Sequence, residues 1–371
     1  MTYPKIRMTL FFTRGIRLQD WYNIGSVKRE IAIYQKLRDY NVHTSFVTYG
    51  DRQDARIASD IMDIPVYPNF FNVNEKRYIH WLPWLHAPLL WRSDVIKTNQ
   101  TNGADIALRA AQKWGKPFIA RFGYMHSFNV AQNEGHDSAS AKHARYLEET
   151  VFTQAQAVIG TTERLCNEVL ERFPQATVYK VPNYVDTEHF APLNIPKAVD
   201  ITYVGRLHPE KNVQALLEAI EHQNVTCRII GGGQQLEAFQ ARFGTLDGRL
   251  DFVGQVAQSD LPRYLNETRI FVMPSLYEGH PKAVIEAMSC GTAVIGTDVN
   301  GTREVINHGL TGWLCATDSD NIGAAIATLM ADEALRQSIG KNARDYVLNN
   351  YNLDTIVEQE YHVIRDVMSM S

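Results

Sequence analysis

The chain has 371 residues, of which 45% are hydrophobic and 21% are charged. This composition excludes a disordered or low-complexity segment, and at roughly 100–200 residues per domain the length indicates two domains. Lys and Arg number 37 and Asp and Glu 41, giving a net charge of -4. That balance argues against a nucleic-acid-binding protein, because such proteins usually show a basic excess.

Short apolar segments alternate with amphipathic segments through the first half of the chain. We predict strands at residues 8–12, 44–48, 95–98, 118–122, 157–160 and 178–181. Apolar residues recur at helical spacing in residues 26–40, 104–114 and 162–173. This alternation is typical of a parallel sheet covered by helices.

The N-terminal segment bears on localisation. Its apolar run at residues 8–12 is too short for the core of a signal peptide, and no stretch approaches the roughly 20 apolar residues of a membrane span. We therefore expect a cytoplasmic protein, or one attached peripherally at the cytoplasmic face of a membrane. The first 50 residues hold 8 basic and 3 acidic side chains, which indicates either a solvated face or attraction to an anionic lipid-linked acceptor or membrane.

Residues 69–91 do not follow the alternation. The prolines at positions 83 and 88 interrupt any long helix, and the segment is rich in aromatic side chains, namely Phe70, Phe71, Tyr78, Trp81, Trp84 and Trp91. It is either a satellite core beneath an irregular connection or an apolar surface that contacts an acceptor or a membrane. Trp and Tyr suit the second reading because they favour an interface with one wet side.

The alternation restarts near residue 200. Strands are predicted at residues 201–204, 227–230, 250–253, 270–273 and 293–296, and helices at residues 213–222, 236–243 and 281–289. A stretch rich in proline and asparagine at residues 182–196 is predicted as the hinge. We expect two doubly wound α/β domains, at residues 1–187 and 188–352, followed by a C-terminal helical segment at residues 353–371.

Two further patterns do not indicate a cofactor or metal site. Gly231-Gly232-Gly233 lacks the Gly-x-Gly-x-x-Gly spacing of dinucleotide sites, so we interpret it as a tight turn that lets a ligand approach the backbone. The cysteines lie far apart, without a Cys-x-x-Cys pair or histidines at zinc spacing. No metal site is predicted from them.

The first candidate for chemistry follows the strand at residues 201–204. Gly205 ends that strand, and Arg206 and Lys211 lie five residues apart on the turn that enters the next helix. Such a turn opens at the carboxyl edge of a parallel sheet, where ligands bind. Two cations there suit a diphosphate, with arginine as a planar fork and lysine as a point charge; the alternative is a pair of solvated surface cations.

Residues 274–301 are the most informative stretch. Glu278 and Gly279 are predicted to form a turn, and Pro281 stands where a helix should begin, a position at which its missing N–H costs nothing. Free backbone N–H groups and the positive end of the helix dipole then lie near Gly279, His280, Pro281 and Lys282. An anion is expected there.

Two carboxylates flank this expected anion site. Glu278 precedes the predicted helix, and Glu286 lies about one and a half turns inside it. A carboxylate beside a phosphate is repelled, so the pair favours hydroxyl groups such as those of a ribose or a sugar ring. Two cations, a helix N-terminus and two carboxylates together predict a nucleotide-sugar site.

These residues resemble the retaining glycosyltransferases of family 4 (glycosyl transferases group 1). The resemblance covers nearly the whole chain and is most specific in Gly205-Arg206-Leu207 with Lys211, and in Glu278 and Glu286 separated by seven residues. It implies the GT-B fold, an α/β architecture of two tandem Rossmann-like domains that face each other across a cleft. The C-terminal helix of such folds crosses back to the first domain.

The resemblance also implies residue roles. Arg206 and Lys211 would bind the diphosphate of the donor, Glu286 the nucleotide ribose, and Glu278 hydroxyls of the transferred sugar. Gly25 would let a loop of the first domain close over the diphosphate. Base recognition would use backbone near residues 253–256, which include Val256. No metal or cofactor is normally required, because the cations and the helix dipole neutralise the leaving group.

One departure from the family pattern affects the candidate catalytic residues. Many members carry a histidine just after the strand that corresponds to residues 118–122, but this chain has Arg121-Phe122-Gly123-Tyr124 there. His126 follows slightly later and is either a replacement or a structural histidine. Arg121 is an equal candidate for contact with donor or acceptor charge.

The implied activity is transfer of a sugar from a nucleoside diphosphate donor to a hydroxyl of a saccharide or lipid-linked saccharide, with retention of configuration. Such enzymes serve polysaccharide or glycoconjugate biosynthesis. Catalysis would rest on Glu278, Arg206, Lys211 and His126, and no covalent nucleophile is assigned. A nucleotide-sugar epimerase of the same fold and a non-catalytic sugar-binding protein remain as alternatives. A phosphorylase is disfavoured, because no motif for a lysine-held pyridoxal phosphate is found.

Overall fold

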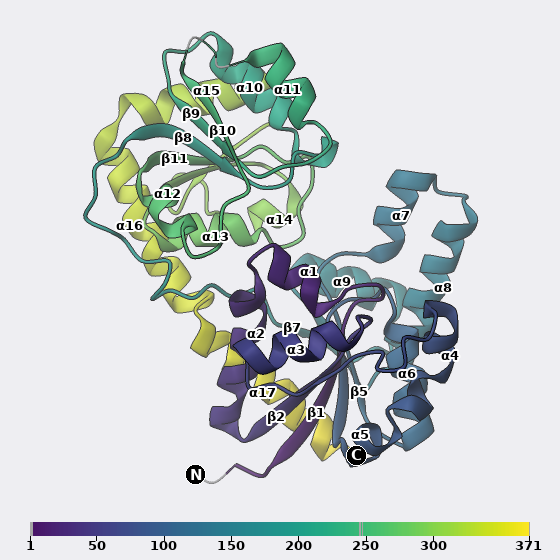
Figure 1. The fold of residues 1–371 in the computed structure, drawn as a ribbon. Helices are drawn as coiled ribbons and strands as arrows, with labels where there is room; N and C mark the ends of the chain where they lie inside the picture. Colours follow the sequence, from purple (N-terminus) through teal and green to yellow (C-terminus); the bar gives the residue numbers. More distant parts are fainter. Residues whose placement is uncertain (1–2, 245, 247, 371) are drawn as a thin grey trace. The chain divides into compact units, whose positions relative to one another are not determined.

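The computed structural model describes residues 3–244, 246 and 248–370. The chain divides into two compact units. The first unit comprises the chain up to Pro182 together with the segment from Ile356 onward, and the second comprises Asn183–Thr355. In each unit a central sheet is covered by helices, as the coloured ribbon in Figure 1 shows.

Within the described residues, the first unit contains a seven-stranded parallel sheet in the order β3-β2-β1-β4-β5-β6-β7. Its central strands carry apolar side chains that are almost fully buried, because both faces are covered by helices. The strands are β1 (Ile6–Phe11), β2 (Val42–Val47), β3 (Val66–Tyr67), β4 (Val95–Thr98), β5 (Phe118–Phe122), β6 (Ala157–Gly160) and β7 (Val178–Lys180).

The helices of the first unit bury an apolar stripe against this sheet. In α6 (Ala104–Trp114) the buried side chains are alanine, isoleucine and leucine, and glycines with left-handed backbone stand at both of its ends. The others are α1 (Leu18–Asn23), α2 (Val27–Lys36), α3 (Arg52–Ile61), α4 (Glu75–Leu85), α5 (Ala87–Arg92), α7 (His126–Glu134), α8 (Ala139–Gln154) and α9 (Glu163–Arg172), with the short 3-10 helix η1 (Leu37–Tyr40).

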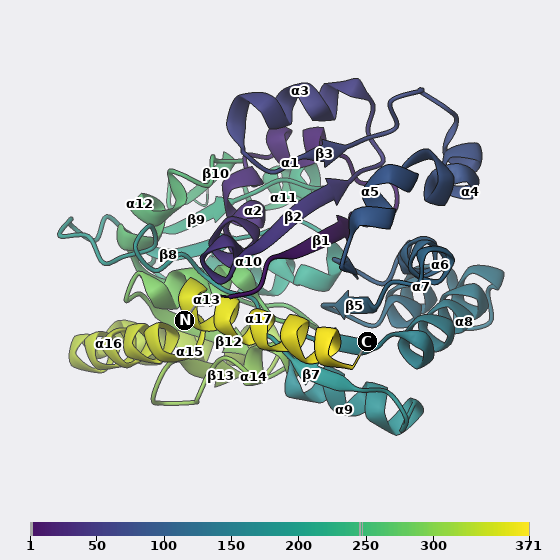
Figure 2. The same ribbon diagram turned by 90° about the horizontal axis from the view of Figure 1, so that it is seen from below.

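Helix α17 (Leu353–Ser369) completes the first unit. It buries Ile356, Val357, Tyr361 and Ile364, and Figure 2 shows it lying along the sheet of that unit. Its buried Glu360 forms an ion pair of 2.8 Å with Lys97 of β4, and both side chains are almost completely removed from solvent. No helix in the described part of the chain has the length and hydropathy needed to cross a membrane.

In the described part of the second unit, six parallel strands form a sheet in the order β10-β9-β8-β11-β12-β13. One continuous apolar core connects the sheet with its helices. The strands are β8 (Val199–Val204), β9 (Cys227–Ile230), β10 (Leu250–Gly254), β11 (Thr268–Met273), β12 (Ala293–Thr297) and β13 (Trp313–Cys315). The helices are η2 (Pro209–Lys211), α10 (Val213–Glu221), α11 (Leu236–Phe243), α12 (Leu261–Asn266), α13 (Lys282–Ser289), α14 (Asn300–Arg303), α15 (Ser319–Ala331) and α16 (Glu333–Asn350).

The structure corrects the prediction of an irregular connection at residues 69–91. That segment contains α4 and α5, and Pro83 lies inside α4. Pro83 has no N–H for the carbonyl of Ile79, four residues earlier, but Arg109 of α6 donates to that oxygen at 3.1 Å. Pro88 stands in the first turn of α5, where its missing donor is tolerated.

A second correction concerns the start of α13. The sequence places Pro281 at the first helical position, whereas the helix begins at Lys282 and Pro281 is its N-cap residue with extended backbone. The N-terminus of α13 therefore lies one residue later in the sequence than predicted.

Candidate functional site

The strand order of the second unit places its candidate residues at one edge of the sheet. The order runs outward from β8 to β9 and β10 on one side, and from β11 to β12 and β13 on the other. The carboxyl ends of β8 and β11 therefore form the topological switch point, where doubly wound sheets bind ligands. The segment with Arg206 and Lys211 follows β8, and the segment with Glu278 follows β11.

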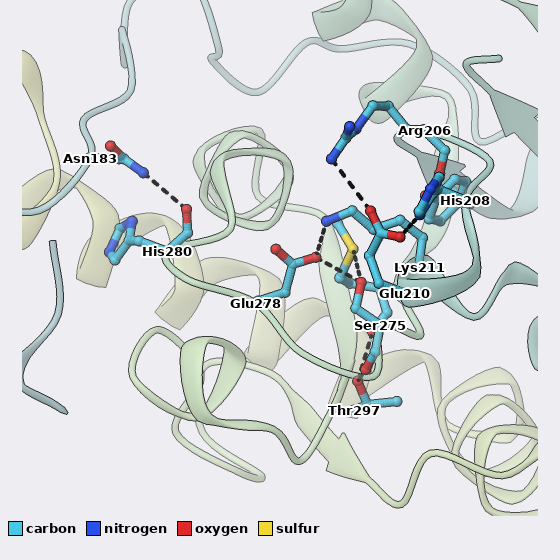
Figure 3. A network of polar contacts seen from close by, with 11 residues as sticks. Asn183, Arg206, His208, Glu210, Lys211, Ser275, Glu278, His280 and Thr297 are labelled. Carbon is cyan, nitrogen blue, oxygen red and sulfur yellow. Dashed lines mark hydrogen bonds and ion pairs between the residues drawn. The ribbon is translucent and has the colours of Figure 1, made fainter. Parts of the chain in front are cut away.

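Lys211 and Glu278 are in direct contact. The Lys211 ammonium donates to Glu278 Oε1 at 2.6 Å, and the two side chains are only 17% and 10% exposed. The Ser275 hydroxyl donates to the same carboxylate oxygen at 2.7 Å, as Figure 3 shows. Residues separated by 67 positions in the sequence thus form one partly buried polar cluster.

Arg206 is held differently from Lys211. Its side chain is 76% exposed, and its guanidinium lies 3.4 Å from a carboxylate oxygen of Glu210. The other oxygen of Glu210 contacts the ring of His208. Figure 3 shows Arg206 extending above the Lys211–Glu278 pair, with Glu210 below its guanidinium. The two cations therefore belong to one region, with Arg206 more accessible to solvent.

Backbone contacts fix these two segments against each other. The Leu276 N–H donates to the Glu210 carbonyl at 2.9 Å, and the Asn212 side-chain amide donates to the Pro274 carbonyl at 3.0 Å. A Cβ at Gly301 would lie 2.1 Å from the Gly279 carbonyl oxygen, so only glycine allows this approach. The turn that carries Glu278 is thereby fixed from both sides.

Glu286 lies on α13 and is 3% exposed. Its Oε1 accepts a hydrogen bond of 3.0 Å from the side-chain amide of Gln258, on the segment that follows β10. Val256 of the same segment packs partly buried against the core of the second unit. Glu286 therefore belongs to the same edge of the sheet, at the side of β10.

His280 is 8% exposed, and its ring packs edge-on against Tyr351 with centroids 5.0 Å apart. Its carbonyl accepts a hydrogen bond of 3.0 Å from the Asn183 side chain, visible at one side of Figure 3. Pro281 is buried and Lys282 is half-buried. The His280 side chain thus packs within the second unit, while the backbone of residues 279–282 forms the entry to α13.

The glycines at 231–233 serve the fold at this edge. A Cβ on Gly231, which has φ +129°, would lie 1.9 Å from the Gly205 carbonyl oxygen, and one on Gly233 would lie 2.5 Å from that of Leu207. The Leu207 N–H also donates to the Gly232 carbonyl at 2.9 Å. The turn itself lies just after the three glycines, at Gln234 and Gln235, and the glycines instead let this strand end approach the segment that carries Arg206.

In the first unit, Gly25 lies in the segment that follows β1. It has a left-handed backbone with φ +68°, which disfavours any side chain. The preceding helix α1 is anchored by the buried carboxylate of Asp54, which accepts hydrogen bonds of 3.0 Å from the N–H groups of Leu18 and Gln19. The loop with Gly25 therefore stands on a fixed base at the switch point between β1 and β4.

His126 and Arg121 also belong to the first unit. His126 is the first residue of α7, and burial lowers the pKa of its imidazole. The next residue, Ser127, donates from its N–H and its hydroxyl to the buried carboxylate of Glu148, at 2.8 and 2.7 Å. Arg121 lies on β5 and is half-buried.

Several polar residues of the site are not predicted from the sequence patterns. Gln258, Ser275 and Glu210 each hold a predicted residue, yet none of them occurs at a spacing that signals chemistry. Glu210 lies between Arg206 and Lys211 in the sequence and could have been noted as their counter-ion. Gln258 could not, because it is separated from Glu286 by 28 positions.

A family model described as Glycosyl transferases group 1 matches residues 185–346. Residues 185–346 therefore form a group 1 glycosyltransferase domain. The matched residues include the whole polar cluster around Lys211, Glu278 and Glu286. The chain is accordingly a glycosyltransferase, and the alternative of a non-catalytic sugar-binding protein is not retained.

Similar curated proteins agree with this family. A glycogen synthase of Mycobacterium tuberculosis is 25% identical over 282 residues, covering 72% of this chain and 67% of that protein. The UDP-Gal:alpha-D-GlcNAc-diphosphoundecaprenol alpha-1,3-galactosyltransferase of Escherichia coli is 30% identical over 196 residues, covering 47% of this chain and 50% of that protein. The second alignment spans about half of each protein.

Solved structures confirm the GT-B fold, with its Rossmann-like units. Sucrose-phosphate synthase from Thermosynechococcus elongatus superposes with a TM-score of 0.80 at 20% identity, covering 99% of this chain and all of that chain. Anabaena Alr3699/HepE in complex with UDP gives a TM-score of 0.78 at 16% identity, covering 97% of this chain and all of that one. At these identities the likeness concerns the fold.

Proposed function

We propose that this glycosyltransferase moves a sugar from a nucleoside diphosphate donor to a hydroxyl group of a saccharide or lipid-linked saccharide, with retention of the anomeric configuration. The contact between Lys211 and Glu278 carries the proposal. It joins a cation suited to phosphate and a carboxylate suited to sugar hydroxyls, 2.6 Å apart, at the switch point of the second sheet. The names of the relatives support transfer over epimerisation.

The donor would bind mainly to the second unit. Arg206 and Lys211 bind the diphosphate, aided by the N-terminus of α13 near residues 279–282. Glu278 accepts hydrogen bonds from hydroxyls of the transferred sugar, and Glu286, oriented by Gln258, accepts them from the ribose. Backbone near Val256 recognises the base, and the loop with Gly25 closes over the diphosphate.

The chemical step breaks the bond between the anomeric carbon and the diphosphate oxygen, and the electron pair leaves with the diphosphate. The acceptor oxygen forms the new bond on the same face, and its proton passes to the departing phosphate. Arg206 and Lys211 stabilise the growing negative charge, a contribution that typically reaches about 10²–10³ in rate for one well-placed donor. His126 or Arg121 of the first unit would contact the reacting groups from the acceptor side.

A thermal-shift panel of nucleoside diphosphates and their sugars tests the donor site. UDP and UDP-sugars come first, because the names of two similar proteins contain them. We expect one nucleotide to raise the unfolding temperature of the wild type, and Arg206→Ala and Lys211→Ala to abolish the shift. Arg242→Ala, an exposed cation of the same unit, is the matched control. Equal shifts in all four proteins would contradict the proposal.

The stereochemistry needs a separate measurement. When the acceptor is known, proton NMR of the first product formed gives its anomeric configuration before any equilibration. A product with the configuration of the donor sugar is expected. Release of an altered nucleotide sugar in the absence of acceptor would instead identify an epimerase.

The first unit is proposed to select the acceptor and to contact a membrane surface peripherally. A lipid-linked acceptor lies at such a surface, and one relative is named for a diphosphoundecaprenol substrate. Recovery of the wild-type chain with sedimented anionic vesicles is the expected outcome. Equal recovery with neutral and anionic vesicles would contradict this part of the proposal.

A further inference from the structure

The basic N-terminal segment does not provide an open cationic surface. Five of its eight basic side chains are paired with carboxylates. The pairs are Arg14 with Glu75, Arg17 with Asp20, Arg29 with Glu30, Lys36 with Asp39 and Arg38 with Asp63. The local excess of positive charge in the sequence is therefore largely compensated in the fold.

Helix α4, in contrast, presents an exposed face with aromatic and basic side chains. It buries Tyr78 and Leu82 against the first unit, and its other face is exposed. Arg77, His80, Trp81 and Trp84 follow the helical spacing of three and four residues, so they share that exposed face. Trp81 and Trp84 are each 53% exposed. Large apolar side chains turned outward in this way are unusual for a surface helix.

Cations of the neighbouring helix α6 lie beside these tryptophans. The Lys113 ammonium stands 3.6 Å above the ring of Trp84, and Arg109 donates to the Ile79 carbonyl at 3.1 Å. No carboxylate among the described residues pairs with Arg77, Arg109 or Lys113. We call this set the α4 surface: Arg77, His80, Trp81, Trp84, Arg109 and Lys113.

We propose that the α4 surface docks the first unit onto an anionic lipid bilayer. Tryptophan favours the headgroup level of a membrane, because its ring is apolar and its N–H is polar. Unpaired arginine and lysine on the same face are attracted to anionic headgroups within a Debye length. Surfaces that combine these two properties bind in the plane of the interface; here α4 supplies the tryptophans and Arg77, and the neighbouring α6 supplies Arg109 and Lys113.

Charge complementarity decides between a bilayer and a neutral saccharide. Stacking on a neutral sugar uses tryptophan rings and gains nothing from three unpaired cations around them. Glu75, in the first turn of α4, is already neutralised by Arg14 at 3.0 Å. The surface is thus basic as well as aromatic, as an anionic membrane requires.

The inference deepens the acceptor part of the proposed function, but it can fail independently of it. Binding to vesicles needs neither donor nor acceptor. Donor-induced thermal shifts report on the second unit, so they remain available to test the transferase proposal when vesicle binding is lost.

The test is co-sedimentation of the full chain with two kinds of vesicle. One contains phosphatidylcholine alone, and the other contains roughly one third phosphatidylglycerol, which presents anionic headgroups. We expect binding to the anionic vesicles only. The double variant Trp81→Ala/Trp84→Ala should weaken the apparent partition coefficient about tenfold or more, because interfacial binding scales with the apolar area inserted. Arg77→Gln/Lys113→Gln should weaken it and reduce its dependence on salt.

Matched controls come from helix α8 of the same unit. Tyr146 is 65% exposed and Lys142 is exposed, so Tyr146→Ala and Lys142→Gln remove an aromatic ring and a cation elsewhere. Brominated phosphatidylcholine included in the anionic vesicles should quench the tryptophan fluorescence of the wild type and quench that of the double variant less. Wild-type levels of binding in the double variant, equal losses in the α8 controls, or binding to neutral vesicles or neutral oligosaccharide alone would each overturn the proposal.

Discussion

At the scale of single residues, the decisive feature is that Lys211 already has a carboxylate partner. Glu278 Oε1 lies 2.6 Å from its ammonium group, and Ser275 holds the same oxygen in place. A diphosphate that binds Lys211 must share this cation with Glu278. The pair therefore orients Lys211 before donor binding, but it also opposes the binding of negative charge.

Glu278→Gln should separate these two effects. Removal of the competing negative charge is expected to tighten binding of the nucleoside diphosphate about fivefold, since a partly exposed pair contributes about 1 kcal/mol. Sugar transfer should fall about 10²–10³-fold, because the amide is a poorer partner for the sugar hydroxyls than a carboxylate. Calorimetry of the diphosphate and initial rates measure the two quantities.

Exposed Glu237 on α11 provides the control for that variant. Glu237→Gln makes the same chemical change within the second unit and should leave both measurements unaltered. Weaker diphosphate binding in Glu278→Gln would contradict the idea that this carboxylate competes for Lys211.

A buried histidine in the first unit should make stability depend on pH. Burial lowers the pKa of His86 to about 4, from an ordinary value of 6.5, and its Nε2 lies 2.8 Å from the Tyr78 hydroxyl. Between these two pKa values the unfolded chain binds a proton that the folded chain does not. Stability from neutral His86 is therefore fully present above pH 6.5 and is lost as the pH falls toward 4.

The expected loss through His86 is up to about 3 kcal/mol between pH 7 and pH 4, since one pKa unit corresponds to about 1.4 kcal/mol. Urea unfolding at several pH values measures it. His86→Gln should show a smaller decline than the wild type, whereas His136→Gln, at an exposed position, should follow the wild type. Identical pH profiles for the wild type and His86→Gln would show that His86 does not carry this dependence.

At the scale of elements, one buried ion pair joins helix α17 to strand β4. Lys97 and Glu360 lie 2.8 Å apart with almost no exposure, and burial lowers the pKa of Lys97. The Lys97 ammonium also lies 5.6 Å from the centre of the Tyr34 ring. A charge left alone in such surroundings is strongly destabilising, because neither water nor another ion can replace its partner.

Glu360→Ala should accordingly lower the free energy of unfolding by about 3–5 kcal/mol. Lys36→Ala, which breaks an exposed ion pair with Asp39 in the same unit, should cost no more than about 1 kcal/mol. Replacing both buried charges, in Lys97→Met/Glu360→Leu, should restore much of the loss. Chemical denaturation measures all three variants, and a double variant less stable than Glu360→Ala would argue against this account.

The elements that the sequence predicts best are those whose pattern is complete within a few residues. The strands at residues 95–98, 118–122, 157–160 and 227–230 agree with the structure at both ends, because each is a short, mostly apolar run set between helical or turn segments. Strands β3 and β13 have two and three residues, too few for any periodicity. Helix α4 is hidden by Pro83, whose effect depends on Arg109 of another helix.

The candidate site divides in the same way. The sequence can place Arg206, Lys211, Glu278 and Glu286 at one edge of the sheet, because each lies in the segment or helix that follows a predicted strand. Their partners lie on other loops, as Gln258 does for Glu286. Such contacts depend on how the segments after β10, β8 and β11 pack, and no local pattern contains that information.

At the scale of the whole molecule, both units repeat one design. Each sheet is parallel, and in each the strand order reverses beside the first strand of the unit, between β1 and β4 and between β8 and β11. The loop with Gly25 follows β1, and the loop with Arg206 follows β8. Two units built alike thus present their glycine-bearing turns at equivalent places, although only the second carries the Lys211–Glu278 pair.

Hydrogen exchange of the full chain should show that the donor acts chiefly on the second unit. At a concentration of about 100 times its Kd, a ligand stabilises the folded state by about 2.7 kcal/mol. We expect the stabilising nucleoside diphosphate to slow amide exchange in residues 205–212 and 275–286, where the N–H groups and cations of the site lie. In the first unit, slower exchange should be confined to the loop around Gly25, and strands β5, β6 and β7 should exchange as before.

Mass spectrometry of peptic fragments measures each segment, and Lys211→Ala under the same conditions should show no slowing. Protection centred on the sheet of the first unit would place the donor there and contradict the assignment of Arg206 and Lys211.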